Sequence, residues 1–314
     1  MNTLAPKSPL ITAIAIILLA IFLFDVMGAI IKHLGTRYPA KQLSMLTNVF
    51  GLIPSVLVLL YSSDWREAGR PVRLVKWKLA IARGGFIAIA QFCFYLSLIH
   101  MEFVTASTIA FSGALFVTLL SIPILGHRVG IWRWSAVGVG FIGIVLVMSP
   151  GTDSFNVYAL LPVCAALGYA ASSVTAQLFD KSVPTALINL YALAGALTGA
   201  VMLVVFTGGY VEVVTYQDWL WLLAMGVAGG SAVFCLVTAY RLTAPSNLAP
   251  FEYFSIPFAF LLGWMFFDEA PFHRLIPGVF LIIGGVCLLS GESERPRLEI
   301  PSMIDNTGDR LSGG

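Results

Sequence analysis

Residues 238–269 read TAYRLTAPSNLAPFEYFSIPFAFLLGWMFFDE, and they determine how the rest of the chain is interpreted. The stretch is apolar enough to lie in lipid, yet it carries Glu252 between Pro250 and Tyr253. A carboxylate inside a membrane is costly unless it has a partner or a function. Glu252 is therefore the first candidate functional residue, and its surroundings are predicted to form a membrane-spanning helix that begins near Asn247.

The rest of the chain shares this apolar character. Of its 314 residues, 58% are hydrophobic and 11% are charged, whereas about 25% of an average soluble chain is charged. A spanning helix needs roughly 20 mostly apolar residues. We therefore predict an all-α polytopic membrane protein with ten transmembrane helices and no soluble domain. The ten predicted spans are 10–31, 42–61, 75–99, 104–125, 131–149, 156–179, 185–206, 217–240, 247–267 and 273–290.

Lys and Arg residues are divided unevenly between the two sides of these spans. If the N-terminus lies inside, thirteen of the 18 basic residues lie inside and four lie outside: Lys32, Arg37, Lys41 and Arg274. The remaining one, Arg83, lies within a span. Cytoplasmic loops carry the excess of Lys and Arg in membrane proteins. The bias predicts an integral membrane protein with both termini in the cytoplasm.

An internal repeat divides the spans into two halves. The shift along the chain that aligns Gly143 with Gly285 also aligns Cys93 with Cys235, and we call it the repeat shift. Each half holds five spans, and because five is odd the halves have opposite orientations. Inverted repeats are typical of secondary transporters, whose substrate sites lie near the bilayer midplane between the halves. The predicted domains are a first repeat at 10–149 (helices 1–5) and a second at 156–290 (helices 6–10), flanked by a cytoplasmic N-terminus at 1–9 and a flexible cytoplasmic tail at 291–314.

Three charged residues, Asp25, Arg83 and Glu252, lie well away from the ends of the predicted spans. Glu252 lies roughly 8 Å into its helix at 1.5 Å per residue, and it either binds substrate or a proton or is a structural acid with a partner. Arg83 enters from the same side, so it can meet Glu252, meet an anionic ligand group, or extend toward the headgroups. Asp25 is a second candidate for substrate or proton binding, or a partner for Lys32 two turns further along the same helix face.

Uncharged polar residues complete the candidate site. Gln91 and Asn48 lie within spans, where they can hydrogen-bond to a solute or between helices. Tyr169 and Tyr253 offer an aromatic surface with a polar tip, either for packing or for a solute. The predicted substrate-binding residues are Glu252, Tyr253, Arg83, Gln91, Asp25, Asn48 and Tyr169, with Glu252 and Asp25 as the candidates for proton coupling.

Other functional classes lack their sequence signals. The four histidines show no metal-ligand spacing, and no GxxxxGK[ST] motif is present. We therefore expect no metal, no cofactor and no ATP-driven transport by this chain alone. No catalytic constellation is visible, which argues against an enzyme, and nothing indicates nucleic-acid binding. The four cysteines all lie within spans, which argues against a disulfide framework.

Several segments resemble a known transporter family. AYRL at 239–242, APSNLAPFEY at 244–253 and LLGWMFFDE at 261–269 resemble the drug/metabolite transporter superfamily, specifically ten-helix transporters built from two EamA-type repeats. FDVMGAIIK at 24–32 and ARGG at 82–85 resemble the subgroup that includes bacterial riboflavin and S-adenosylmethionine uptake proteins.

The resemblance covers essentially residues 10–290 and implies a function and a location in the bacterial inner (plasma) membrane. It implies a secondary transporter that moves a small organic metabolite by alternating access, the substrate being a vitamin, a nucleoside-like or an amino-acid-like solute. The expected partners are this solute, the lipid bilayer and protons as a candidate coupling ion, and the chain is a monomer or a homodimer. The alternatives are a metabolite or drug exporter of the same family and, less favoured, a membrane scaffold or receptor without transport. Two departures leave the substrate open: many relatives have Arg in place of Asn48, and Gly-Glu-Arg in place of Gly126, His127 and Arg128.

Overall fold

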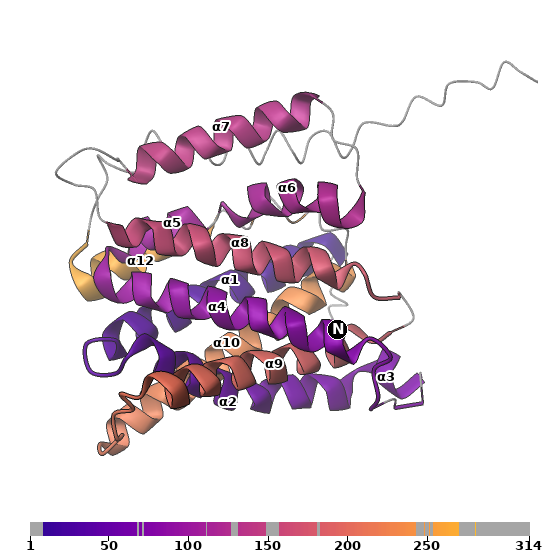
Figure 1. Ribbon diagram of the computed structural model, residues 1–314, viewed down its shortest axis with the longest axis horizontal. Coiled ribbons are helices and arrows are strands. Elements are labelled where there is room, and N and C mark those ends of the chain that lie inside the picture. Colours follow the sequence, from indigo (N-terminus) through magenta and orange to yellow (C-terminus); the bar gives the residue numbers. More distant parts are fainter. Residues whose placement is uncertain are drawn as a thin grey trace, which may run out of the picture.

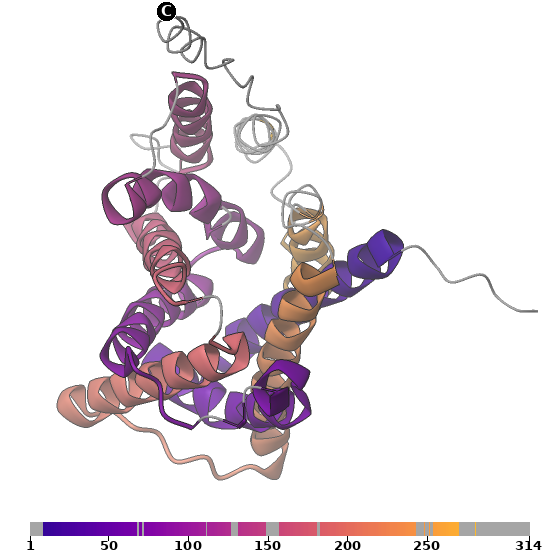
Figure 2. The same ribbon diagram turned by 90° about the vertical axis from the view of Figure 1, so that its right-hand side faces the viewer.

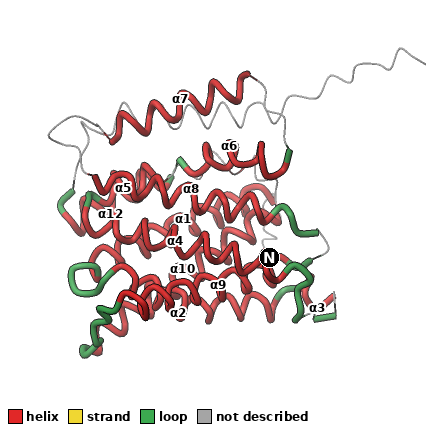
Figure 3. The backbone as a smooth tube through the Cα atoms, viewed as in Figure 1, coloured by secondary structure: helices red, strands yellow, loops and turns green. Residues whose placement is uncertain are grey.

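Every regular element that the structure describes is a helix (Figure 3). The computed structural model describes residues 9–269, apart from 68, 71, 111, 127–130, 149–156, 181–182, 243–247, 249–250 and 252–253, together with residue 280. The elements are α1 (Pro9–Leu34), α2 (Ala40–Tyr61), α3 (Ser63–Glu67), α4 (Trp77–His100), α5 (Phe103–Ala110), α6 (Gly113–Leu125), α7 (Ile131–Met148), the 3-10 turn η1 (Val157–Ala159), α8 (Leu160–Ala176), α9 (Thr185–Thr207), α10 (Tyr216–Leu242) and α12 (Ser255–Phe267).

Seven stretches of helix in this part of the chain are long and apolar enough to cross a membrane. They are α1, α2, α4, α5 with α6, η1 with α8, α9 and α10. Apart from residue 280, the predicted tenth span at 273–290 and the tail from residue 291 lie outside the described residues. Cys93, Cys164 and Cys235 are free thiols, and Cys287 lies outside the described residues.

Two predicted spans are interrupted by turns. Ser112 separates α5 from α6 within the span predicted at 104–125. Phe254 forms a turn directly before α12. Pro257 lies in the first turn of α12, where its missing N–H removes no hydrogen bond of that helix.

The helix boundaries of the two halves follow the repeat shift. The paired helix ends are Leu34 and Ala176 for α1 and α8, His100 and Leu242 for α4 and α10, and Leu125 and Phe267 for α6 and α12. The residues that cap α6 and α12 follow it too, since Gly126 (φ 69°) and Asp268 (φ 54°) both adopt the left-handed conformation.

Paired helices run in opposite directions through the bundle. Lys32, near the end of α1, bonds to the Met101 carbonyl just after α4, and we call this side of the bundle the Lys32 end. Lys76, just before α4, donates to the Leu178 carbonyl just after α8 at 2.8 Å, and we call this side the Lys76 end. Thus α1 ends at the Lys32 end, whereas its counterpart α8 ends at the Lys76 end.

The helices form two arms on a shared base (Figures 1 and 2). The base contains α2 and α9, which pack against each other. One side, which we call the α4–α8 arm, contains α4 to α8, and the other, which we call the α1 arm, contains α1, α10 and α12. The most extensive helix packing also follows the repeat. In the α1 arm α1 packs along α10, and in the α4–α8 arm their counterparts α8 and α4 pack along each other.

The two arms touch at the Lys32 end. A Cβ added to Gly28 of α1 would lie 2.9 Å from the Phe103 ring of α5, and one added to Gly263 of α12 would lie 3.0 Å from Val104. Toward the Lys76 end, α6 packs on α8, and in the described part of the chain it makes no extensive contact with α1 or α12. The arms are therefore joined at one end of the bundle.

Candidate functional site

Asp25 is a buried carboxyl group at mid-membrane depth. It is 5% exposed, and the Ser255 hydroxyl at the start of α12 donates to its Oδ1 at 2.8 Å. Its Oδ2 has no hydrogen-bond partner among the described residues. Asp25 lies nine residues before the end of α1, or about 14 Å at 1.5 Å per residue, close to half of a hydrocarbon core of about 30 Å.

The alternative in which Lys32 pairs with Asp25 is wrong. Lys32 Nζ instead lies 2.6 Å from Glu269 Oε1 and 2.6 Å from the Met101 carbonyl oxygen. Lys32 follows Asp25 by seven residues, or about two helical turns, which is too far for a direct contact when a nearer acid is available. Asp25 therefore keeps Ser255 as its described partner.

Phe103 separates Asp25 from the Lys32 end. Gly28, whose missing side chain makes room for the Phe103 ring, follows Asp25 by three residues and so lies one turn nearer that end on the same helix face. Ser107 follows Phe103 by four residues on α5 and lies one turn deeper on the face that meets the α1 arm. Ser107 is 4% exposed. Asp25 and Ser107 thus occupy the same layer beneath the contact between Phe103 and Gly28.

Asn48 and Gln91 form an amide pair in this layer. Asn48 Nδ2 donates to Gln91 Oε1 at 2.8 Å, and Gln91 Nε2 lies 3.4 Å from Asn48 Oδ1. The Ser44 hydroxyl also donates to Gln91 Oε1 at 3.2 Å. Asn48 is eight residues into α2 and Gln91 is nine residues before the end of α4, which places both about 12–14 Å from the Lys32 end. The pair links α2 to α4.

Tyr169 lies at the same depth on α8. It is nine residues from the start of that helix, and α8 packs along α4. Its position therefore brings an aromatic surface from the second half to the layer that holds the Asn48–Gln91 pair.

Arg83 stands apart from these groups. It is 6% exposed, and its Nε donates to the Ser172 carbonyl at 2.9 Å while its guanidinium lies 6.0 Å from the Phe179 ring. Its Nη1 has no partner among the described residues. Eight residues separate Arg83 from Gln91 along α4, so Arg83 lies about 12 Å nearer the Lys76 end. Glu252 and Tyr253 lie outside the described residues, so the predicted meeting of Arg83 with Glu252 stays a prediction.

Sequence reasoning missed three groups at this site. Ser255 and Ser44 are common residue types that carry no signal in isolation, although Ser44 precedes Asn48 by one helical turn. Glu269 follows an apolar run, and a single sequence gives it no partner. Its ion pair with Lys32 joins residues that lie far apart in the chain, and nothing in the sequence pairs them.

The comparison with protein families places the chain. The EamA-like transporter family matches residues 11–149 and 156–291, which together cover most of the sequence. The protein belongs to this family. It is an integral membrane protein of the drug/metabolite transporter type, and its two family matches fall on the two halves described above.

Curated relatives resemble the chain over most of its length. The pseudopaline exporter of Pseudomonas aeruginosa is 27% identical over 280 residues, covering 89% of this chain and 96% of the relative. The riboflavin transporter of Brucella anthropi is 27% identical, with coverages of 80% and 88%. The S-adenosylmethionine uptake transporter of Rickettsia conorii is 25% identical, with coverages of 87% and 90%.

A solved structure shares the fold. One crystal structure superposes with a TM-score of 0.63 over 91% of this chain and 99% of the other, at 20% sequence identity. The likeness extends over nearly the whole of both chains, and at this level of identity it shows the fold alone.

Proposed function

We propose that this protein is a secondary transporter that moves a small organic metabolite across the bacterial inner membrane by alternating access. The observation that carries the proposal is the layer of polar side chains at mid-membrane depth, with Asp25 buried and one oxygen unpartnered among the described residues. Buried polar groups without partners are costly in lipid and mark solute or ion pathways. The family match and the transporter relatives support the same function.

The proposed architecture is ten helices in two inverted five-helix repeats at 10–149 and 156–290. It is supported by the shared spacing of the helix ends and by the opposite directions of α1 and α8. The cluster of Lys and Arg at residues 66–78 lies at the Lys76 end. The positive-inside rule therefore orients this end, and both termini, toward the cytoplasm.

The solute binds between the two arms in the polar layer. Asp25 takes up a positive group of the solute or the coupled proton, and Tyr169, Asn48 and Gln91 offer aromatic surface and hydrogen bonds. Arg83 binds an anionic group nearer the cytoplasm. Glu252 and Tyr253 complete the site, with Glu252 as a second proton carrier. Solutes of this kind include vitamins, nucleoside-like and amino-acid-like molecules, which is the range that the relatives' names suggest.

Reconstitution into liposomes tests this function. Purified protein is assayed against a panel of labelled vitamins, nucleosides and amino acids, with and without a pH gradient. We expect one class to accumulate and Asp25→Asn to abolish it. If no member of a broad panel moves or binds, the transport proposal fails.

Export is the second candidate function. It is favoured by the pseudopaline exporter, which is similar over 96% of its length. Loading the same solutes inside the vesicles and measuring efflux separates the two directions. Coupling to an inward proton gradient that drives efflux supports an exporter, whereas solute accumulation supports an importer.

A further inference from the structure

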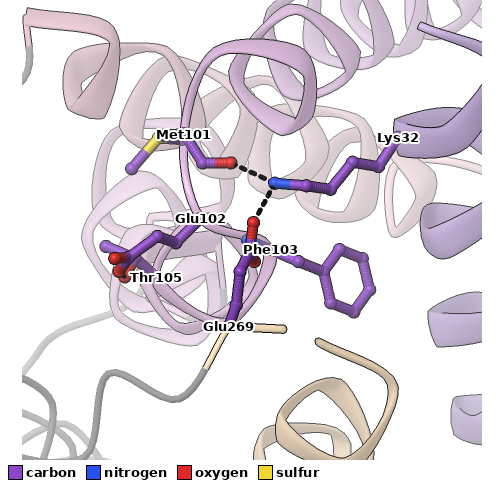
Figure 4. Close-up of polar contacts among 6 residues, drawn as sticks. All are labelled: Lys32, Met101, Glu102, Phe103, Thr105 and Glu269. Carbon is purple, nitrogen blue, oxygen red and sulfur yellow. Dashed lines mark hydrogen bonds and ion pairs between the residues drawn. The ribbon is translucent and has the colours of Figure 1, made fainter. Parts of the chain in front are cut away.

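A charged cluster joins the two arms at the Lys32 end. Lys32 of α1 and Glu269 after α12 form an ion pair of 2.6 Å, and their side chains are only 14% and 17% exposed. Figure 4 shows that each also reaches the turn between α4 and α5. Lys32 donates to the Met101 carbonyl at 2.6 Å, and Glu269 Oε2 accepts from the Phe103 backbone N–H at 2.6 Å.

Both charges belong to the α1 arm, and both backbone partners belong to the α4–α8 arm. The ion pair therefore binds the turn between α4 and α5 on the opposite arm, through the Met101 carbonyl and the Phe103 N–H. The carboxylate of Glu269 also lies at the first residue of α5, where the helix dipole favours a negative charge. Hydrogen bonds to ionised groups are stronger than neutral ones, particularly where water is largely excluded.

The backbone after α12 places Glu269 at this turn. Asp268 adopts a left-handed conformation with φ 54°, and the Glu269 N–H returns to the Gly263 carbonyl at 3.1 Å. A left-handed residue just after a helix is a common way to reverse the chain at the helix end. It turns Glu269 back toward α5 and α1, and away from the bulk water beyond the helix end.

The repeat has no second copy of this cluster. Under the repeat shift, Val174 corresponds to Lys32, and Val174 is an uncharged residue buried on α8. The position that corresponds to Glu269 is His127, so neither charge of the ion pair has its counterpart in the sequence. The ion pair at the Lys32 end therefore has no copy related by the repeat, although the helices that carry it have repeat counterparts.

We propose that Lys32 and Glu269 form a clasp that closes the solute path at the Lys32 end and opens when the transporter changes state. The inference rests on the proposed transport function. With the clasp formed, the Phe103 ring lies against Gly28 and covers the layer of Asp25 and Ser107. Releasing the turn between α4 and α5 moves Phe103 away with its helix and exposes that layer to the outer solution. Transport then requires the clasp to break and re-form once per cycle.

Thiol accessibility tests the clasp without any knowledge of the substrate. Ser107→Cys is introduced after Cys93, Cys164, Cys235 and Cys287 are replaced by serine, and its reaction with a membrane-impermeant maleimide is measured in right-side-out and inside-out vesicles. We expect Glu269→Gln and Lys32→Gln each to raise the rate from the Lys32 face about tenfold. A hydrogen bond to a charged group is strong enough to shift a two-state population by that factor.

Two double variants sharpen the test. Lys32→Gln with Glu269→Gln leaves no unpaired buried charge, so it should fold well and react as fast as either single variant. The charge swap Lys32→Glu with Glu269→Lys restores an ion pair but reverses donor and acceptor, so it cannot bind the Met101 carbonyl and the Phe103 N–H. We expect Ser107→Cys to be labelled as fast in the charge-swap variant as in the single variants. Slow labelling in the charge-swap variant would contradict the proposal that Lys32 and Glu269 bind the turn between α4 and α5.

Arg37→Gln is the matched control. Arg37 pairs with Asp218 at 2.8 Å at the same end, but that pair joins the α1–α2 link to α10 and does not touch the α4–α8 arm. Its labelling rate should equal that of the parent. The clasp proposal fails if the labelling rate of Ser107→Cys is unchanged in both single variants and in the double Gln variant while all three proteins are monodisperse. Failure to find a transported solute bears on the transport proposal alone.

Discussion

Ser255 Oγ and Asp25 Oδ1 lie 2.8 Å apart and connect α12 to α1 at mid-membrane depth. Both residues are buried, at 3% and 5% exposure. A hydroxyl that donates to a carboxyl oxygen fixes the side chain while leaving the second oxygen for another partner. Since Ser255 follows Glu252 by three residues, the bond also ties Asp25 to the segment that carries the second predicted acid.

Replacing Asp25 by Asn should abolish most transport. The variant keeps the size and the Oδ1 acceptor but removes the negative charge that a solute cation or a coupled proton needs. We expect uptake of the solute found in the liposome assay to fall at least about tenfold, as for loss of a charge-assisted contact. Initial rates at equal reconstituted protein measure this. Ser255→Ala should reduce the rate only a few-fold, and Ser55→Ala, which removes a hydroxyl bonded within α2, should leave it unchanged. Full activity of Asp25→Asn would rule out a charged role for this residue.

Gly84 should not tolerate a side chain, whereas its neighbour Gly85 should. A Cβ at Gly84 would collide with the backbone of α9 at Ala192 and Gly195, while one at Gly85 meets nothing within 4 Å. Overpacking of this kind costs about 1–3 kcal/mol, and Ala is favoured over Gly in a helix by about 1 kcal/mol. We expect Gly84→Ala to lower the thermal midpoint in detergent by several degrees and Gly85→Ala to hold or raise it. Equal midpoints would show that α4 and α9 can separate at no cost.

Most of the helices can be predicted from the apolar runs in the sequence, but the turns that interrupt them cannot. Apolar runs predict the long helices, and a few glycines and cysteines that match under the repeat shift predict the register that the helix ends later share. The turns at Ser112 and Phe254 were not predicted, because both lie in sequence as apolar as the helices around them. Hydropathy reports burial in lipid, and it does not report where the backbone leaves the helix.

The candidate site divides in the same way. The cost of charge in lipid indicates that Asp25 and Arg83 are buried, and both are. Which groups a buried polar side chain bonds to depends on packing between segments that are distant in the chain. The sequence therefore could not decide whether Asn48 and Gln91 bind the solute or form hydrogen bonds between helices. They bond to each other in the structure. It also offered Lys32 as a partner for Asp25, because a single sequence shows neighbours on one helix and not those on another.

The Asp218 cluster should stabilise the Lys32 end mainly through Tyr38. Asp218 Oδ2 accepts from the buried Tyr38 hydroxyl at 2.8 Å, and Oδ1 accepts from Arg37. Burial, together with the hydrogen bond to Asp218, raises the pKa of the Tyr38 hydroxyl, so it stays protonated and remains a donor at neutral pH. Tyr38→Phe leaves a buried carboxylate oxygen without this donor, which costs about 1–3 kcal/mol. Arg37 is 57% exposed, so Arg37→Gln should cost at most about 1 kcal/mol. Thermal midpoints in detergent rank the two, and a larger loss for Arg37→Gln would contradict the assignment.

Asp268 should accept only residues that tolerate a left-handed backbone. Its φ of 54° suits glycine, and Asn and Asp adopt it more readily than other side chains. Asp268→Gly and Asp268→Asn should therefore keep the turn after α12 and the position of Glu269. Asp268→Val strains the backbone by about 1–2 kcal/mol, and relief of that strain moves Glu269 away from Lys32 and Phe103. We expect the Val variant to raise the labelling of Ser107→Cys as Glu269→Gln does, although it retains both charges. Parent-like labelling of Asp268→Val would show that Glu269 reaches its partners without help from this turn.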